Sequence, residues 1–402
     1  MTLRRVLGLG TYPVVSPVHG GQRRVNAIRT FYRRIGIDYV HACVYDSTIY
    51  GPPLVGPHDI PLVAASTAFG PTALTGDLLS GLQSETHDPS WRHFLQTMER
   101  VKPDALQLEQ AFMWPLAKRV LQTAGQWLPI IYSSHNVEAP LKLAIMESSG
   151  VARELRDKVT GIIENIESEI CNSAALIVCV SLSDRGYYRQ LAACPIIVAS
   201  NGVDRPPATP PDRKIVRTAF GNNRFVFTVG SAYVPNIEGF CDCVAEGGIF
   251  FSPPLKSIAV CGGISDGILG HPKYQRFLAA NSARVSFFPQ ISDIDLWAIK
   301  NACHGVVLPI LSGGGSNLKT AEALTLGKWI VATPTALRGF EAFADAEGVI
   351  VAKNRRDFHR GIARVLRAPP LEMSEASRKA RDVLHWDVLF ETCGLADELR
   401  RI

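Results

Sequence analysis

The feature that most constrains the fold of this chain is an alternation of short β-rich runs with amphipathic helical runs. The β-rich runs of the first half are RRVLGLG, DYVHACVY, PDALQLEQ, LPIIYSSHN, AALIVCVS and PIIVASNGVD. Those of the second half are RFVFTVGS, SIAVCGG, ARVSFFPQIS, GVVLPILSGGG, WIVATP and GVIVA. Alternating strand and helix patterns predict a mostly parallel sheet covered by helices on both faces. Two such halves predict an α/β protein with two Rossmann-like domains, whose ligands bind in a cleft beyond the carboxyl ends of the strands.

Proline marks the predicted boundary between the two halves. The stretch PPATPPD begins at Pro206, and it cannot form a helix interior or a central strand. A chain of 402 residues is long for one domain and sufficient for two. We therefore predict a linker at this stretch.

Composition excludes several classes of protein. Apolar residues make up 47% of the chain and charged residues 20%, which is ordinary globular usage. No apolar run approaches the roughly 18 residues that span a bilayer, and the N-terminal stretch is typical of a first strand rather than a signal peptide. The nine cysteines include no CxxC pair, and Cys241 and Cys243 alone do not form a zinc site. We expect a cytoplasmic protein with reduced thiols.

The N-terminal part of the chain is strongly basic. Its first 37 residues contain no acid and seven arginines, which are Arg4, Arg5, Arg23, Arg24, Arg29, Arg33 and Arg34. On a helical wheel, Val25, Ile28, Tyr32 and Ile35 fall within about 80° of one another. The arginines of this helix are therefore predicted to occupy an exposed basic surface. That surface is either a solvated helix face or a patch for anionic lipid or a phosphorylated acceptor.

The segment LPILSGGGSNLKTAEALTLGKWIVAT combines a buried strand, a glycine loop and a helix start. Ser316 is a suitable N-cap residue, which places Lys319 at the third helical position. A cation in the first turn opposes the helix dipole by about 0.3–1 kcal/mol, unless an anion binds at the helix N-terminus. Glu322 lies one turn further on the same side and can accept hydrogen bonds from vicinal hydroxyls. A site for a phosphate next to a site for a diol indicates a nucleotide ligand. A solvent-exposed Lys–Glu pair after a flexible loop is the alternative, and the Walker A spacing is absent.

The same segment, read to Phe340, resembles the donor-binding region of retaining glycosyltransferases of family 4, which have the two-domain GT-B fold. Other pieces match the family in the expected order: SPVHGGQRRV, YSSHNVE, SNGVD, FTVGSAYVPNIEGF and VSFFPQISDIDLWAIKNACHGVVLPI. The ordered set spans most of the chain. The architecture that it implies is an acceptor domain over residues 1–205, joined by a C-terminal helix at about 385–402, and a donor domain over 206–384.

The resemblance implies a role for each matching position. The implied donor-binding residues are Gly20, Gly21, Gly230, Ser231, Gln290, Ile291, Gly313, Gly314, Gly315, Ser316, Asn317, Leu318, Lys319 and Glu322. Gln290 and Ile291 would contact the base, and Glu322 would bind the ribose hydroxyls. His135 would lie close to the transferred sugar, although a lone histidine after an apolar strand is more often structural. The implied catalytic residues are His135, Lys319 and Glu322.

The chain also departs from the family pattern. The family often has Glu-x7-Glu, but Gly314 stands eight residues before Glu322. Leu311 and Asn317 stand where the glycine-rich subgroup commonly has arginine. The negative charge of the phosphates would then be balanced by Lys319, the helix N-terminus and other arginines. Arg338 and the pair Arg23 and Arg24 are the candidates.

The resemblance implies a hexosyltransferase-like enzyme of polysaccharide biosynthesis. It would use a UDP- or GDP-sugar as co-substrate, with no metal and no other cofactor, and a glycan or lipid-linked acceptor. No nucleic-acid partner is expected, and the basic helix leaves open a peripheral contact with the inner membrane face. A nucleotide-sugar epimerase and a catalytically inactive binding subunit are the alternatives. The motif DID at Asp293 is read as a helix start rather than a metal site.

Overall fold

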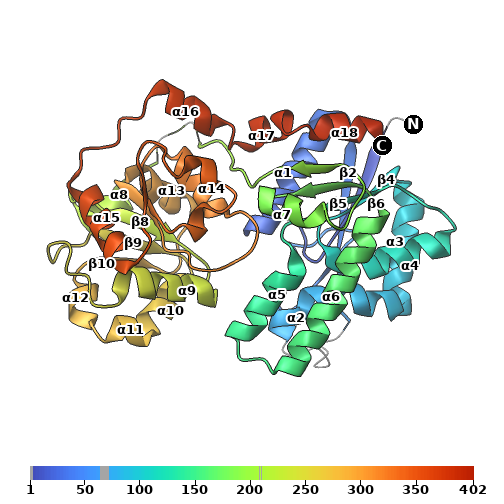
Figure 1. The fold of residues 1–402 in the computed structure, drawn as a ribbon, viewed down its shortest axis with the longest axis horizontal. Coiled ribbons are helices and arrows are strands. Elements are labelled where there is room, and N and C mark those ends of the chain that lie inside the picture. The colour runs from blue at the N-terminus through green and yellow to red at the C-terminus, as the bar shows by residue number, and fades with distance from the viewer. Residues whose placement is uncertain (1–2, 64–71, 208, 210) are drawn as a thin grey trace. The chain divides into compact units, whose positions relative to one another are not determined.

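The computed structural model describes residues 3–63, 72–207, 209 and 211–402 of the chain (Figure 1). The chain divides into two compact units, each with its own sheet. Unit 1 contains Met1–Ser200 and Trp386–Ile402, and unit 2 contains Asn201–His385. The first unit is therefore built from both ends of the chain, whereas the second is one continuous segment.

Unit 1 is organised around a seven-stranded parallel sheet with the order β3-β2-β1-β4-β5-β6-β7. Its strands are β1 (Arg5–Gly10), β2 (Asp38–Tyr45), β3 (Ile60–Pro61), β4 (Ala105–Leu108), β5 (Ile130–Ser133), β6 (Ala174–Cys179) and β7 (Ile196–Val198). Strands β4 and β5 are buried along their whole length, as expected for parallel strands covered on both faces. The strand order reverses between β1 and β4.

Helices cover both faces of this sheet (Figure 1). They are α1 (Gly20–Arg34), α2 (Thr72–Thr86), α3 (Asp88–Val101), η2 (Ala111–Met113), α4 (Trp114–Ala124), α5 (Glu138–Ser148), α6 (Arg153–Ser173), α7 (Leu182–Tyr188), α17 (Trp386–Thr392) and α18 (Leu395–Arg401). The C-terminal helix α17 packs on α1, where Phe390 stacks on Phe31 at 5.4 Å between ring centroids. Arg34 forms an ion pair with Glu391 of α17 at 3.1 Å.

Helix α1 differs from the predicted basic helix. Arg24 is only 1% exposed, and its Nη1 atom donates to the carbonyl oxygens of Ala199 at 2.8 Å and Ser200 at 3.2 Å. The prediction of an exposed basic surface was therefore wrong at Arg24. Phe31 also lies in the buried stripe, because α17 covers a face that the wheel assigned to solvent. Arg33 and Arg34 remain exposed at the end of the helix.

Unit 2 contains a six-stranded parallel sheet with the order β10-β9-β8-β11-β12-β13. Its strands are β8 (Val226–Val229), β9 (Ile258–Cys261), β10 (Val285–Phe288), β11 (Gly305–Leu308), β12 (Trp329–Ala332) and β13 (Val349–Val351). The order reverses between β8 and β11. Separate apolar clusters fill the two faces of this sheet.

The helices of unit 2 are short on average. They are α8 (Lys214–Phe220), α9 (Val234–Phe240), η3 (Cys241–Ala245), α10 (Ile264–Gly270), α11 (Pro272–Gln275), α12 (Leu278–Ser282), α13 (Asp293–Ala302), α14 (Leu318–Thr325), η4 (Thr335–Leu337), η5 (Glu341–Phe343), α15 (Arg355–Arg367) and α16 (Glu375–Asp382). The helix predicted to start at the DID motif is confirmed, because α13 begins at Asp293 with Ser292 as its N-cap. The predicted parallel α/β halves are confirmed as well.

Two further findings concern the chain as a whole. Within the described residues, no helix is both long and apolar enough to cross a membrane. All nine cysteines lie in the described part of the chain and none forms a disulfide, and seven of them are buried.

Candidate functional site

The carboxyl ends of β8 and β11 form the first candidate site. These two strands are neighbours, and the strand order reverses between them. In open parallel sheets, ligands bind outside the carboxyl ends of the strands at such a reversal. Gly230 and Ser231 follow β8, and the glycine loop follows β11. The fold therefore brings these sequence-predicted residues to one point of unit 2.

The Arg338 side chain forms hydrogen bonds with the backbone of the glycine loop. Its Nε atom donates to the carbonyl oxygen of Gly315 at 2.6 Å, and its Nη2 atom donates to that of Gly314 at 2.8 Å. Gly313 and Gly315 have φ angles of 131° and 55°, which favour glycine. Arg338, a candidate for phosphate charge, thus contacts the backbone of this loop.

The helix after the loop begins one residue later than predicted. Asn317, not Ser316, is the N-cap of α14, because its Oδ1 atom accepts from the amide of Lys319 at 3.0 Å. The Ser316 hydroxyl instead accepts from the amide of Asn201 at 3.1 Å, and the Ser316 carbonyl accepts from Asn201 Nδ2 at 2.8 Å. Lys319 therefore occupies the second helical position, and Leu318 the first.

Lys319 connects α14 to α9, and through it to the loop after β8. Its Nζ atom donates to Asn236 Oδ1 at 2.7 Å, and Asn236 Nδ2 donates to the carbonyl oxygen of Ser231 at 3.2 Å. Burial lowers the pKa of Lys319 to about 8, although Glu322 acts in the opposite direction. Burial makes the charged form of this half-buried ammonium group unfavourable, and a bound anion would stabilise that form.

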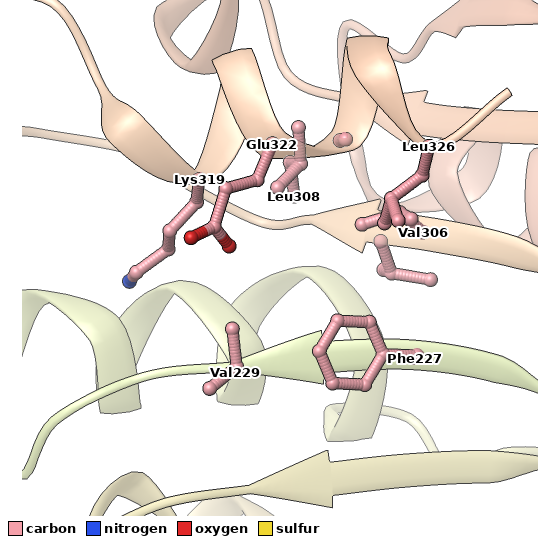
Figure 2. A pocket seen from close by; sticks show the side chains of 9 residues that line it. Phe227, Val229, Val306, Leu308, Lys319, Glu322 and Leu326 are labelled. Carbon is pink, nitrogen blue, oxygen red and sulfur yellow. The ribbon is translucent and has the colours of Figure 1, made fainter. Parts of the chain in front are cut away.

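Glu322 lies beside Lys319 at the mouth of a small pocket. Figure 2 shows both side chains extending from α14 toward the end of β8, with Val229 across from them. Glu322 Oε2 forms an ion pair with Lys300 Nζ of α13 at 2.9 Å. The predicted placement of Lys319 and Glu322 on one side of the helix is confirmed. The alternative of a fully exposed pair is wrong, because neither side chain is exposed.

Close backbone approaches fix the geometry around this pocket. A Cβ atom on Gly239 of α9 would lie 2.0 Å from the carbonyl oxygen of Pro309, which follows β11. A Cβ atom on Gly262 would lie 2.6 Å from the carbonyl oxygen of Gly230. These glycines let α9 and the loop after β9 pack directly on the two strand ends that carry the site.

Gln290 and Ile291 follow β10 at the same edge of the sheet. Strand β10 is two strands from β8, which corresponds to about 10 Å at ordinary strand spacing. Gln290 is exposed, and Ile291 packs partly on the apolar cluster of unit 2.

The carboxyl ends of β1, β4 and β5 form a second candidate site, in unit 1. Gly20 and Gly21 open α1, and the N-cap of this helix is His19. His19 Nδ1 accepts from the amide of Gln22, and Gln22 Oε1 accepts from the amide of His19. A Cβ atom on Gly21 would lie 2.2 Å from the Tyr12 hydroxyl oxygen, so this glycine leaves space for the tyrosine side chain.

His135 follows β5 and is embedded in a polar cluster that the sequence did not reveal. Its Nδ1 atom lies 3.2 Å from the Tyr12 hydroxyl, and its Nε2 atom lies 3.4 Å from Glu109 Oε2. Glu109 follows β4 and is fully buried. Tyr12 and Glu109 were not predicted from the sequence, and neither were Asn236 and Lys300 in unit 2. The acid that ends the apolar strand in PDALQLEQ was the available signal.

Among the residues that the structure describes, no group of three or more His, Cys, Asp or Glu side chains could hold a metal ion.

The chain was also compared with known proteins. No protein-family model matches the sequence, and no curated protein sequence matches it either. Sucrose-phosphate synthase from Thermosynechococcus elongatus is similar in structure, with a TM-score of 0.68 and 16% identity over 98% of this chain and 99% of that one. Anabaena HepE in complex with UDP and glucose has a TM-score of 0.65 and 14% identity over 99% and 100%. WaaG, a glycosyltransferase involved in lipopolysaccharide biosynthesis, has a TM-score of 0.59 and 14% identity over 98% and 99%.

At these identities the similarity concerns the fold. The similarity covers nearly the whole length of each chain, and it agrees with the presence of one parallel sheet in each of units 1 and 2. The GT-B fold expected from the sequence resemblance is therefore confirmed.

Proposed function

We propose that this chain, on the premise of its GT-B fold, is a glycosyltransferase that moves a sugar from a nucleoside-diphosphate donor to an acceptor hydroxyl. The observation that carries the proposal is the convergence at the β8–β11 reversal. A glycine loop, a helix N-terminus, a half-buried lysine and a carboxylate lie there together. The first three suit a diphosphate and the fourth suits a ribose diol.

The roles follow from the charge that develops during the reaction. Breaking the anomeric C–O bond leaves negative charge on the β-phosphate of the departing nucleotide. Fixed donors at this point accelerate the step more than donors that must reorganise. The amide of Leu318 at the N-terminus of α14 and the ammonium group of Lys319 are such donors, because Asn317 caps the helix and Asn236 holds the ammonium group in place.

Other residues extend the proposed donor site. Glu322 would accept hydrogen bonds from the ribose hydroxyls beside its ion pair with Lys300, and Gln290 and Ile291 would contact the base. Gly20, Gly21 and His135 would serve the sugar or its acceptor. Following the family resemblance, we propose a retaining, metal-independent reaction with a UDP- or GDP-sugar.

The acceptor in this proposal is a glycan or a lipid-linked saccharide. Of the arginines of α1 that suggested a basic surface, Arg33 and Arg34 are exposed, and Arg34 pairs with Glu391. Peripheral contact with an anionic membrane from the cytoplasmic side is proposed through this end of α1.

The test is turnover of a panel of nucleotide sugars by the purified protein, with Glu322→Ala as a variant. We expect transfer, or slow donor hydrolysis, with one base and one sugar. Loss of hydrogen bonds to a charged group costs about 1.5–3 kcal/mol, so the variant should bind the matching nucleoside diphosphate roughly 10- to 100-fold more weakly by calorimetry. Sugar interconversion without transfer would identify an epimerase. Folded protein that is silent with every donor would identify a binding subunit.

A further inference from the structure

A series of polar side chains in unit 1 runs from buried Glu109 through His135 to partly exposed Tyr12. Glu109 is 0% exposed, the His135 side chain is 11% exposed, and Tyr12 is partly exposed. The three residues follow β4, β5 and β1, and the strand order reverses between β1 and β4. The cluster thus lies where an open parallel sheet places its ligands.

Two hydrogen-bond donors hold Glu109, the buried end of this series, in place. Glu109 Oε1 accepts from the Tyr39 hydroxyl and from Gln107 Nε2, the latter at 2.7 Å. Gln107 is itself held, because its Oε1 atom accepts from the Tyr32 hydroxyl at 2.6 Å. With Oε1 doubly occupied, Glu109 Oε2 is left to face His135.

The contact between Glu109 and His135 requires a proton between them. Glu109 Oε2 and His135 Nε2 are 3.4 Å apart, both are shielded from solvent, and neither has another hydrogen-bonding partner among the described residues. Burial alone would raise the pKa of Glu109, but its bonds to His135 and Tyr39 hold the pKa below the usual value. Burial lowers the pKa of His135. A carboxylate therefore faces a neutral imidazole, which must present an N–H to it.

We propose that Glu109 is a positioning residue that fixes the tautomer of His135. Nε2 carries the ring proton and donates to Glu109. Nδ1 is then an acceptor and takes the hydrogen of the Tyr12 hydroxyl. The Tyr12 oxygen, whose hydrogen points to His135, then offers its lone pairs to a hydroxyl of the bound sugar or acceptor, which donates a hydrogen bond to it. The last step rests on the proposed function.

The variant Glu109→Gln separates this role from a structural one. Tyr39 and Gln107 donate to Oε1, so the amide oxygen must occupy that position and the amide NH2 must take the place of Oε2. The NH2 group donates to His135 Nε2, and the ring proton moves to Nδ1. Tyr12 must then accept from Nδ1, and its own hydrogen turns outward. The surface atom changes from acceptor to donor in a side chain of almost unchanged shape.

The primary measurement is the tautomer of His135 by nitrogen-15 NMR of the whole protein, with the resonance assigned through His135→Gln. We expect protonated Nε2 in the wild type and in Tyr12→Phe, and protonated Nδ1 in Glu109→Gln. The matched control is Glu138→Gln, which alters another buried carboxyl, one that accepts from Asn136 Nδ2 at 3.3 Å, and it should leave the tautomer unchanged. Protonated Nδ1 in the wild type, or an unchanged tautomer in Glu109→Gln, would overturn the proposal. The wild-type spectrum decides even if that variant does not fold.

The second measurement is kcat/KM with the donor and acceptor identified by the panel. Glu109→Gln and Tyr12→Phe should each lose roughly 2- to 10-fold, the effect of one hydrogen bond between neutral groups. Glu138→Gln should keep its activity. Full activity in Glu109→Gln with an inverted tautomer would contradict the contact with substrate. If the wild type is inactive with every donor, the proposed function fails, whereas the tautomer result stands because it needs no substrate.

Discussion

The charge of Lys319 changes within the ordinary range of pH. Its pKa of about 8 means that its ammonium form dominates at pH 7 and is lost as the pH rises through 8. The second phosphate pKa is near 6, so the charge of a nucleoside diphosphate stays constant in this range. The affinity for the diphosphate should therefore fall between pH 7 and pH 9, by at most tenfold per pH unit. Titration calorimetry at several pH values measures it.

The control for this prediction is Lys319→Gln, which keeps a donor for Asn236 but carries no charge. Its affinity should be lower than that of the wild type at pH 7 and independent of pH up to 9. A wild-type affinity that is constant from pH 7 to 9 would show that Lys319 does not contact the anion.

Single residues also show where prediction from sequence ends. Lys319 and Glu322 could be predicted as candidates because both belong to one continuous motif. Ser316 and Asn317 are equally good N-caps by type, and the choice between them depends on Asn201, more than a hundred residues away. Glu109 escaped notice for a related reason. Its partners Tyr39 and His135 come from other strands, and no local spacing relates them.

At the scale of elements, the proposed donor site depends on how closely α9 approaches β11. Gly239 makes this approach possible, because any Cβ atom there would collide with the carbonyl oxygen of Pro309. Gly239→Ala should destabilise the protein by about 1–3 kcal/mol, the usual effect of overpacking. It should also weaken nucleotide binding, since α9 carries Asn236. Urea unfolding and calorimetry measure the two effects.

Gly161 of α6 provides the matched control. A Cβ atom there would have no neighbour within 4 Å. Because glycine within a helix costs roughly 0.5–1 kcal/mol relative to alanine, Gly161→Ala should be neutral or stabilising. Equal stability of the two variants would mean that the backbone adjusts at Gly239 without strain.

Helix α1 is the element whose surface the sequence misassigned. Arg24 is buried against two carbonyl groups near the end of unit 1, and such a contact cannot be read from a helical wheel. Arg24→Met should leave the Ala199 carbonyl without this donor and destabilise the protein by about 1–3 kcal/mol. The exposed Arg33 is the control, and Arg33→Gln should change the stability by less than about 0.5 kcal/mol. Urea midpoints of the two variants should therefore differ clearly, and similar midpoints would contradict the buried role of Arg24.

At the scale of the whole molecule, the order of strands and helices was predictable because parallel strands are continuous apolar runs bounded by turns. β2 matches DYVHACVY residue for residue, and the β11 run GVVL is fully buried as expected. The short strand β3 was not predicted, because two residues carry no periodicity. How the C-terminal residues return to unit 1 also depends on contacts that no local pattern encodes.

Because the C-terminal residues pack on unit 1, we predict that deleting them destabilises unit 1 more than unit 2. Phe390 is 1% exposed between Phe31 and Trp386, and Leu395 and Leu399 are each 1% exposed. Deleting residues 386–402 removes these side chains from unit 1 and uncovers Phe31 on α1. Unit 2 keeps all of its own residues, because 201–385 is continuous and has its own apolar clusters. The deletion should therefore lower the stability of unit 1 by several kcal/mol, since burial of each large side chain contributes about 1.5–3 kcal/mol.

Scanning calorimetry with and without the nucleoside diphosphate assigns the transitions. A ligand at 100 times its Kd stabilises the unit that binds it by about 2.7 kcal/mol. In the truncated protein, the transition that the ligand shifts should keep its temperature, whereas the other should move down. Phe390→Ala tests the same contact with the chain intact and should reproduce part of the effect. If truncation lowers both transitions equally, unit 2 does not fold independently of unit 1. If it lowers neither, the packing of α17 on α1 contributes nothing to stability.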